Sequence, residues 1–191
     1  MNQARVLRAA DYPRMPWKNG AGTTLEILRD NPSATGLEAF DWRLSIADVG
    51  QSGGFSLFNG YQRIITVLEG EGMQLSIDGQ PSRPLLKLDA LAFSGDSQVQ
   101  CQLLGGAIRD FNLIYSPERC RARLQWLAAG KSTLFSSAKT LLVFSAGEGL
   151  RVGFEGETVV LEQYDCLQLD GAELRQVSFE AKAAYCLIEI G

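Results

Sequence analysis

The residues best suited to chemistry are cations, amides and hydroxyl groups in a few short stretches. Residues 16–27 read PWKNGAGTTLEI, where a glycine turn precedes a β-prone run. Its candidate ligand-binding side chains are Trp17, Lys18, Asn19, Thr23 and Thr24. Turn chemistry explains the glycines and Asn19, but not the neighbouring Trp and Lys. We interpret the stretch as one wall of an anion site, with a structural clasp as the alternative.

Two arginines lie inside strand-like segments. In DWRLSIADV, alternation places Arg43 and Ser45 on one face. That face lines a pocket if it points into a barrel, and is ordinary surface if it points to solvent. Arg63 in RIITVLEG is open to the same two interpretations. Because guanidinium groups bind carboxylates through paired hydrogen bonds, two such cations near one cavity would suit a dianionic small molecule.

The segment DFNLIY supplies two further candidates, Asn112 and Tyr115. Asn112 alternates with Ile114, so it is a candidate for the inner face, where a buried amide needs hydrogen-bond partners. A ligand is one such partner, and the backbone of a neighbouring strand is the other. Asp48 and Asp96 follow strand-like runs and are expected to serve as turn or cation partners.

Several classes of function are excluded by composition. The chain has no histidine, which removes catalytic triads, Cys–His pairs and His-ligated metals together. A net charge of −4 without any basic run argues against nucleic-acid or anionic-membrane partners. The four cysteines have no metal-site spacing and are expected to be reduced, mostly in the core.

The elements that must position these residues are short strands separated by glycine turns, typical of an all-β sandwich or barrel. The expected strands are 42–49, 63–70, 73–79, 85–93, 97–104, 111–115, 140–147, 150–154, 158–169 and 183–190. One short helix or helical turn is expected within 118–131, ended by Gly130.

An internal repeat runs through these strands. VLEGEGMQLSIDG (67–79) aligns with VFSAGEGLRVGFEG (143–156). Downstream, LDALAFSG (88–95) aligns with YDCLQLDG (164–171), which superimposes Asp89 on Asp165. Two copies in register indicate a duplicated β-domain, although glycine turns in any all-β protein look alike.

The hairpin pattern of both copies resembles the cupin pattern, so the chain resembles a bicupin. PWKNGAGTTLEI, the run from DWRLSIADVG to VLEGEGMQL, AFSGD and RDFNLIY together resemble the HutD/Ves family of small bicupins. The resemblance implies an all-β, duplicated cupin β-barrel or jelly-roll sandwich with little helix. It further implies one bicupin unit over 1–191, with an N-terminal half at 1–118 and a C-terminal half at 119–191.

The cupin resemblance also assigns the places where metal-binding cupins carry their ligands. The glutamate place falls on Arg63, the first two histidine places near Ser56 and Phe58, and the third near Gln98. A guanidinium there would repel a divalent metal and attract a carboxylate. We therefore expect neither a metal nor another cofactor.

The resemblance implies a role in histidine utilisation or stress response, without an established enzyme activity. The leading hypothesis is a metal-independent cupin that binds a small anionic metabolite, such as formylglutamate or urocanate, and senses or modulates amino-acid catabolism. The alternative is a cofactor-free isomerase, lyase or hydrolase for a small carboxylate, whose base would be Lys18, Tyr115, Asp48 or Asp96. No catalytic residue is assigned.

Partners and location are expected from absences and from the fold class. The first twenty residues lack the apolar core of a signal peptide, so a cytoplasmic location is expected. Exposed edge strands make a homodimer, or an interaction with a regulator, a third hypothesis.

Overall fold

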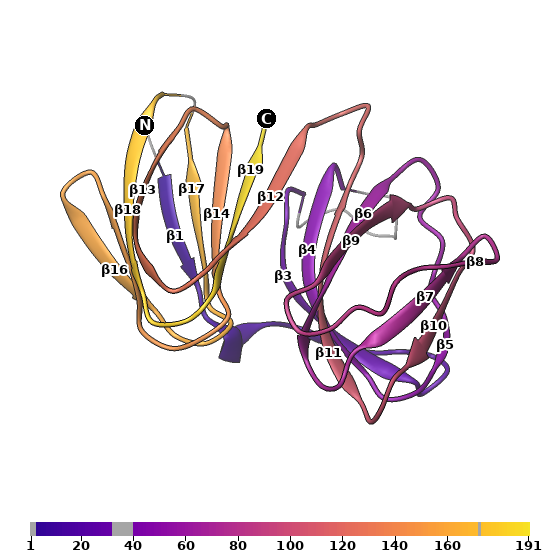
Figure 1. Cartoon of the computed structure of the whole chain (residues 1–191). Helices are drawn as coiled ribbons and strands as arrows, with labels where there is room; N and C mark the ends of the chain where they lie inside the picture. Colours follow the sequence, from indigo (N-terminus) through magenta and orange to yellow (C-terminus); the bar gives the residue numbers. More distant parts are fainter. Residues whose placement is uncertain (1–2, 32–39, 172) are drawn as a thin grey trace. The chain divides into compact units, whose positions relative to one another are not determined.

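The computed structural model describes residues 3–31, 40–171 and 173–191 (Figure 1). Strands dominate, as the alternating sequence predicts, and the one helical element of these ranges is the 3-10 helix η1 (Ala9–Asp11). None of the described elements is a helix long and apolar enough to cross a membrane. The chain divides into two compact units. We call Pro13–Cys120 the central unit, and the residues up to Tyr12 together with Arg121–Gly191 the terminal unit.

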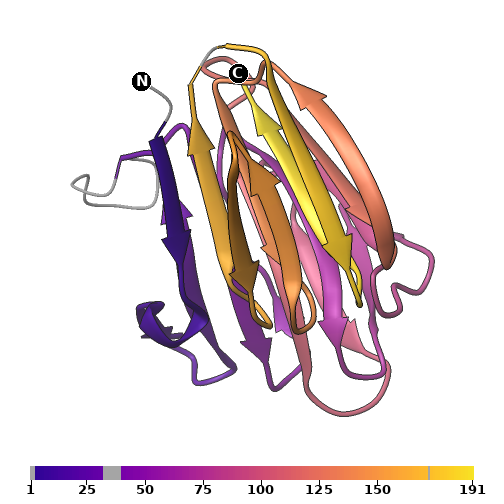
Figure 2. The same cartoon turned by 90° about the vertical axis from the view of Figure 1, so that its left-hand side faces the viewer.

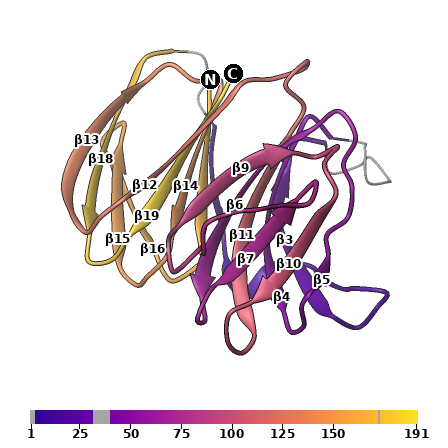
Figure 3. The ribbon, with the colours of Figure 1, turned by 45° about the vertical axis from the view of Figure 1, so that its right-hand side comes forward.

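Two antiparallel sheets form the central unit (Figure 3). The larger sheet contains, in order, β2 (Arg14–Pro16), β3 (Gly22–Arg29), β4 (Trp42–Val49), β11 (Ile108–Tyr115), β6 (Gln62–Glu69) and β9 (Ala90–Ser94). The smaller contains β5 (Gly53–Gly54), β10 (Val99–Leu103), β7 (Met73–Ile77) and β8 (Gln80–Pro81). Their facing apolar side chains form a core that includes Ile65, Val67, Met73 and Leu75.

The terminal unit repeats this arrangement. Its first sheet contains, in order, β1 (Gln3–Leu7), β17 (Cys166–Asp170), β14 (Thr140–Ser145), β19 (Tyr185–Ile190) and β12 (Ala122–Leu127). Its second contains β13 (Gly130–Ser136), β18 (Arg175–Ala181), β15 (Leu150–Phe154) and β16 (Glu157–Leu161). The first residues of the chain belong here because β1 pairs with β17 over five residues (Figure 2). The units therefore differ from the expected halves 1–118 and 119–191 in that the residues up to Tyr12 belong to the terminal unit.

The internal repeat is confirmed by the backbone. Leu88 and Tyr164, the residues before the aligned aspartates, both have left-handed φ angles, 65° and 68°. Asp89 accepts a hydrogen bond from the backbone N–H three residues before it, and so does Asp165. The strand order β11-β6-β9 of the central unit corresponds to β19-β14-β17 of the terminal unit.

Two expectations about local structure are wrong. Residues 118–131 contain strand β12 rather than a helix, because pairing with β19 outweighs a weak helical pattern. The expected strand 158–169 is two strands, β16 and β17, interrupted by a turn at Tyr164 and Asp165.

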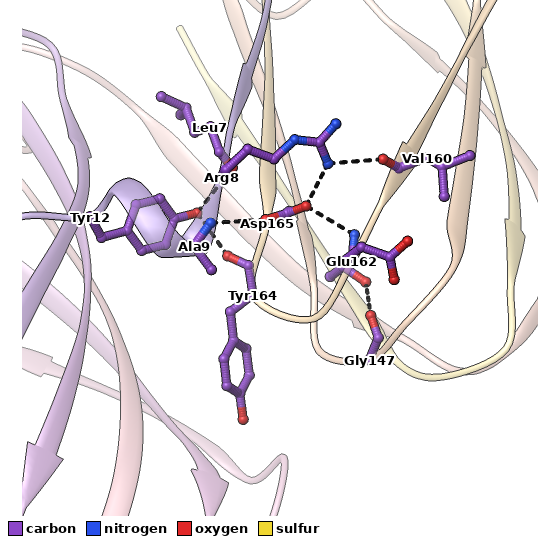
Figure 4. Close-up of polar contacts among 10 residues, drawn as sticks. Leu7, Arg8, Ala9, Tyr12, Gly147, Val160, Glu162, Tyr164 and Asp165 are labelled. Carbon is purple, nitrogen blue, oxygen red and sulfur yellow. Dashed lines mark hydrogen bonds and ion pairs between the residues drawn. The ribbon is translucent and has the colours of Figure 1, made fainter.

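Asp165 joins the first residues of the chain to this turn (Figure 4). Its carboxylate accepts hydrogen bonds from the backbone N–H of Ala9 at 2.8 Å and from that of Glu162 at 3.0 Å. The Arg8 guanidinium donates to the same carboxylate at 2.6 Å. Asp165 is 4% exposed, so water is excluded from replacing these contacts.

We expect Asp165→Asn to lower the free energy of unfolding by about 1–3 kcal/mol, because one acceptor oxygen becomes a donor facing buried donors. The repeat supplies a matched control in Asp89→Asn. The carboxylate of Asp89 is half-exposed, so water can replace its hydrogen bonds. Urea unfolding of both variants checks this, and equal losses would contradict it.

Candidate functional site

A row of polar side chains crosses the inner face of the larger sheet in the central unit. Strand register places Arg43, Ile114 and Arg63 side by side on β4, β11 and β6. Two residues along, Ser45 lies opposite Asn112 on the same face. This face is the inner one, because the residues that follow at two-residue intervals along the same strands belong to the core. They are Ala47, Val49, Ile65, Val67 and Ile108. The inward alternative for Arg43, Ser45 and Asn112 is the observed one.

Arg63 is a buried cation with neutral neighbours. It is 7% exposed, and its Nη2 donates to Asn112 Oδ1 at 2.9 Å. Nη1 donates to the carbonyl of Ser56 at 3.3 Å, while Nε is buried and has no hydrogen-bond partner among the described residues. Three aromatic rings lie 5.1–5.4 Å from its Cζ, those of Phe55, Phe58 and Phe93. Burial lowers the pKa of Arg63 to about 10, so the side chain remains a cation at neutral pH.

Asp110 completes a hydrogen-bonded chain with Asn112 and Arg63. Asn112 Nδ2 donates to Asp110 Oδ1 at 2.5 Å, and Asp110 is 1% exposed. Burial raises the pKa of Asp110 to about 7, and Asp48 adds to the increase, against the opposing effects of Arg63 and the Asn112 hydrogen bond. Sequence reasoning missed Asp110, although its two-residue spacing from Asn112 places both on one face.

Arg43 already has a carboxylate partner. Glu26 of β3 accepts from Arg43 Nε at 2.8 Å through one oxygen and from Arg29 Nε at 2.8 Å through the other. Glu26 was not singled out from the sequence, because no pattern pairs it with residues on another strand. The two arginines of the row therefore differ: Arg43 is neutralised by Glu26, whereas Arg63 has no ion pair with an acid among the described residues.

The PWKNG turn forms one side of a hollow of about 180 Å³. Trp17 and Asn19 line it together with Ala21, Val49 and residues 51–55. Trp17 Nε1 donates to Thr24 Oγ1 at 2.8 Å, and Asn19 Oδ1 accepts from the N–H of Ala21 at 3.0 Å. The stretch thus has both a clasping hydrogen bond and a cavity wall. Phe55 also lines the hollow, and its ring lies over Arg63.

Three sequence candidates lie outside this cluster. Lys18 is exposed. Thr23 and Tyr115 are an odd number of residues from Thr24 and Asn112, so they lie on the opposite faces of β3 and β11. Asp48 and Asp96 have the roles expected of them. Asp48 accepts from Arg109 at 2.6 Å, and Asp96 accepts from the N–H of Gly60 at 3.0 Å.

The donor set does not fit the metal of metal-binding cupins. The glutamate place holds the buried cation Arg63, and the chain has no histidine. Within the described ranges, no group of three or more Cys, Asp or Glu side chains could hold an ion. The cysteines are unpaired, and Cys101, Cys166 and Cys186 are buried as expected.

The terminal unit lacks this polar layer. The hydrogen bonds of the aligned turns place Val67 on Ser145, and Asp110 lies opposite Val67 as Tyr185 lies opposite Ser145. Tyr185 belongs to the apolar core of its unit. The same fold is therefore built with an uncharged residue at the place of Asp110, so stability does not require a carboxyl group there.

Comparison with known proteins identifies the family. The sequence model described as HutD matches residues 9–187. The chain belongs to the HutD family. An uncharacterized 21.2 kDa protein in the hutC 3' region of Pseudomonas putida is 61% identical over 191 residues, 100% of this chain and 98% of the relative. Protein Ves of Escherichia fergusonii is 37% identical over 131 residues, 66% of each chain.

Solved structures agree with this HutD assignment. HutD from Pseudomonas fluorescens SBW25 has a TM-score of 0.88 and 56% identity, covering 98% of each chain. Protein YlbA of E. coli has a TM-score of 0.74 at 9% identity, over 98% of this chain and 90% of its own, which shows the fold alone. The expected all-β cupin fold is confirmed by this fold-level likeness.

The pKa of Asp110 predicts how stability changes with pH. Between pH 4 and 7 the folded state keeps a proton that the unfolded state releases. The contribution of Asp110 to stability therefore falls as pH rises through this range, by up to about 1.4 kcal/mol per pH unit, and levels off above it.

We expect the difference in unfolding free energy between wild type and Asp110→Asn to shift in favour of the variant from pH 5 to pH 8. Urea unfolding at several pH values measures this difference. The control is Asp78→Asn, which makes the same change at an exposed turn. If the difference in unfolding free energy between wild type and Asp110→Asn is as independent of pH as that for Asp78→Asn, the raised pKa of Asp110 is contradicted.

Proposed function

We propose that the central unit binds a small carboxylate metabolite at Arg63 without a metal, and that the protein thereby senses or modulates histidine and amino-acid catabolism. Formylglutamate and urocanate represent the ligand class. The observation that carries the proposal is the buried guanidinium of Arg63. Its Nε has no partner within the described residues, and it lies beneath a ring that lines a hollow.

The energetics favour an anion at this place. Removing a guanidinium from water costs several kcal/mol, and neutral hydrogen-bond acceptors and aromatic faces repay only part of it. The nearest carboxyl group in the hydrogen-bonded chain, Asp110, is reached through Asn112 rather than directly. A ligand carboxylate would supply the missing counter-charge and an acceptor for Nε in a region of low dielectric, where both interactions are strong.

The hollow supplies an approach to the cation. Trp17 and Asn19 offer an aromatic face and an amide on one side, and Phe55 separates the hollow from Arg63 on the other. Gly53 and Gly54 precede Phe55, and an added Cβ at Gly53 would meet no atom within 4 Å. Phe55 therefore connects the lining of the hollow to Arg63.

The relatives support the metabolic part of the proposal. The Pseudomonas putida relative is named for its position in the hutC 3' region, and the Pseudomonas fluorescens HutD structure is described as a formate condition. Formate is the smallest carboxylate, so it is a useful minimal probe beside the two larger metabolites.

We expect isothermal titration at pH 7 to detect binding of formylglutamate or urocanate by the wild type. Arg63→Met should weaken it by about tenfold or more, because a hydrogen bond to a charged group is worth roughly 1.5–3 kcal/mol. The matched control is Arg151→Met, which removes an exposed arginine of the terminal unit. Circular dichroism verifies that each variant is folded. Equal or negligible binding by wild type and Arg63→Met would overturn the proposal.

A second candidate function is a cofactor-free isomerase, lyase or hydrolase for the same class of carboxylate. The observation in its favour is Asp110, a buried carboxyl group whose pKa is raised to about 7, which suits proton transfer near neutral pH. Turnover that a chelator does not affect, and that Asp110→Asn abolishes while binding persists, would favour the enzyme. The exposed Lys18 serves as control through Lys18→Ala.

A further inference from the structure

We infer that anion binding at Arg63 is coupled to proton uptake by Asp110 through Asn112, so that the site holds its carboxylate more tightly at acid than at alkaline pH. The inference rests on the proposed carboxylate site. It adds a regulatory property that simple ion pairing with an arginine would not have.

The geometry joins the two charged groups through one amide. Arg63 Nη2 donates to Asn112 Oδ1 at 2.9 Å, and Asn112 Nδ2 donates to Asp110 Oδ1 at 2.5 Å. All three side chains are at most 7% exposed, so water does not screen them. The Asp110 oxygen that faces Asn112 accepts its hydrogen bond whether the other oxygen is protonated or not. The chain of hydrogen bonds therefore survives a change of charge on Asp110.

Charge balance then links the ligand to the proton. Before binding, Arg63 is the cation that offsets a negative charge on Asp110. A ligand carboxylate on Arg63 would place a second anion in the same low-dielectric interior. Two carboxylates that share one cation raise each other's proton affinity, and the buried one takes the proton. Asp110 becomes a neutral carboxylic acid while the ligand stays ionised.

The other charged or titratable groups around Asp110 do not take up the proton or supply the counter-charge in its place. Asp48 of β4 adds a negative field, which favours the protonated form. Cys101 of β10 is buried, with a pKa raised by burial to about 12, so it stays neutral. Arg43, also of β4, is held by Glu26 of β3 and is not free to take over from Arg63.

The repeat shows that the carboxyl group occurs in the unit that has Arg63 and has no counterpart at the same place in the other unit. The corresponding place in the terminal unit holds Tyr185, and the place of Arg63 holds Leu141, both in the apolar core of that unit. Packing does not require the carboxyl group of Asp110, and Asn112 links it to Arg63 of the proposed site. Both observations favour a role of Asp110 in binding.

The experiment measures affinity and proton uptake together. Formylglutamate is the first probe, because both of its carboxyl groups stay ionised from pH 6 to 9. Since the pKa of Asp110 is about 7, we expect the Kd to rise by up to about tenfold per pH unit above pH 7. Titration at pH 8 in HEPES and in Tris, which differ in ionisation enthalpy, should show uptake of about one proton.

Variants separate the coupling from the binding. Asp110→Asn should bind formylglutamate with a Kd that is nearly constant from pH 6 to 9, and should show no buffer-dependent heat. Asp78→Asn should keep the pH dependence of the wild type. If Asp110→Asn fails to fold, the proton count on the wild type decides alone.

The failures are distinguishable. If neither formylglutamate nor urocanate binds at any pH, the proposed function itself is wrong. If binding depends on Arg63 but the Kd is constant and no proton is taken up, the coupling is wrong and the carboxylate site stands. If only urocanate binds, the same titrations are made with it between pH 7.5 and 9, where the imidazole does not change charge.

Discussion

The burial of one guanidinium is the constraint on which the interior of the central unit depends. Arg63 is held by an amide, a carbonyl and three aromatic rings, and none of these carries a negative charge. A cation in such surroundings is stabilised by matched donors and by a nearby counter-charge. Within the part of the chain that the structure describes, Nε has no acceptor and the link to Asp110 is indirect, which defines what the site lacks. A bound carboxylate would provide both.

Duplication clarifies which features serve the fold and which do not. Both units share strand order, left-handed residues before aligned aspartates, and the hydrogen bonds of those aspartates. They differ in what fills the interior, where Leu141 and Tyr185 in one unit correspond to Arg63 and Asp110 in the other. Features that both copies keep belong to folding, so the charged layer of one copy alone is the better guide to function.

Alternation within one strand was enough to place Arg43 and Ser45 on one face and to make Asn112 a candidate for the inner face. The register of three strands then made Arg43 and Arg63 neighbours in a row. Which face was the inner one depended on tertiary packing. Glu26 was missed because its partner Arg43 lies on another strand, which leaves no trace in local spacing. Asp110 was missed although it lies two residues from Asn112 on the same strand.

The same reason explains the errors in the fold. Residues 118–131 have a local pattern open to helix or strand, and only the distant strand β19 decides for β12. Tyr164 adopts a left-handed conformation, which is uncommon for a tyrosine. The break between β16 and β17 could therefore not be predicted from the sequence.

The pairing of β1 with β17 has a consequence for how the chain is made. The central unit is contiguous, so a ribosome exposes all of it before the terminal unit is complete. Strand β1 has its partner more than 150 residues later in the chain, and closing so long a loop is slow. The unit with the proposed site can fold during synthesis before its duplicate, which must wait until β17 and β19 have been made.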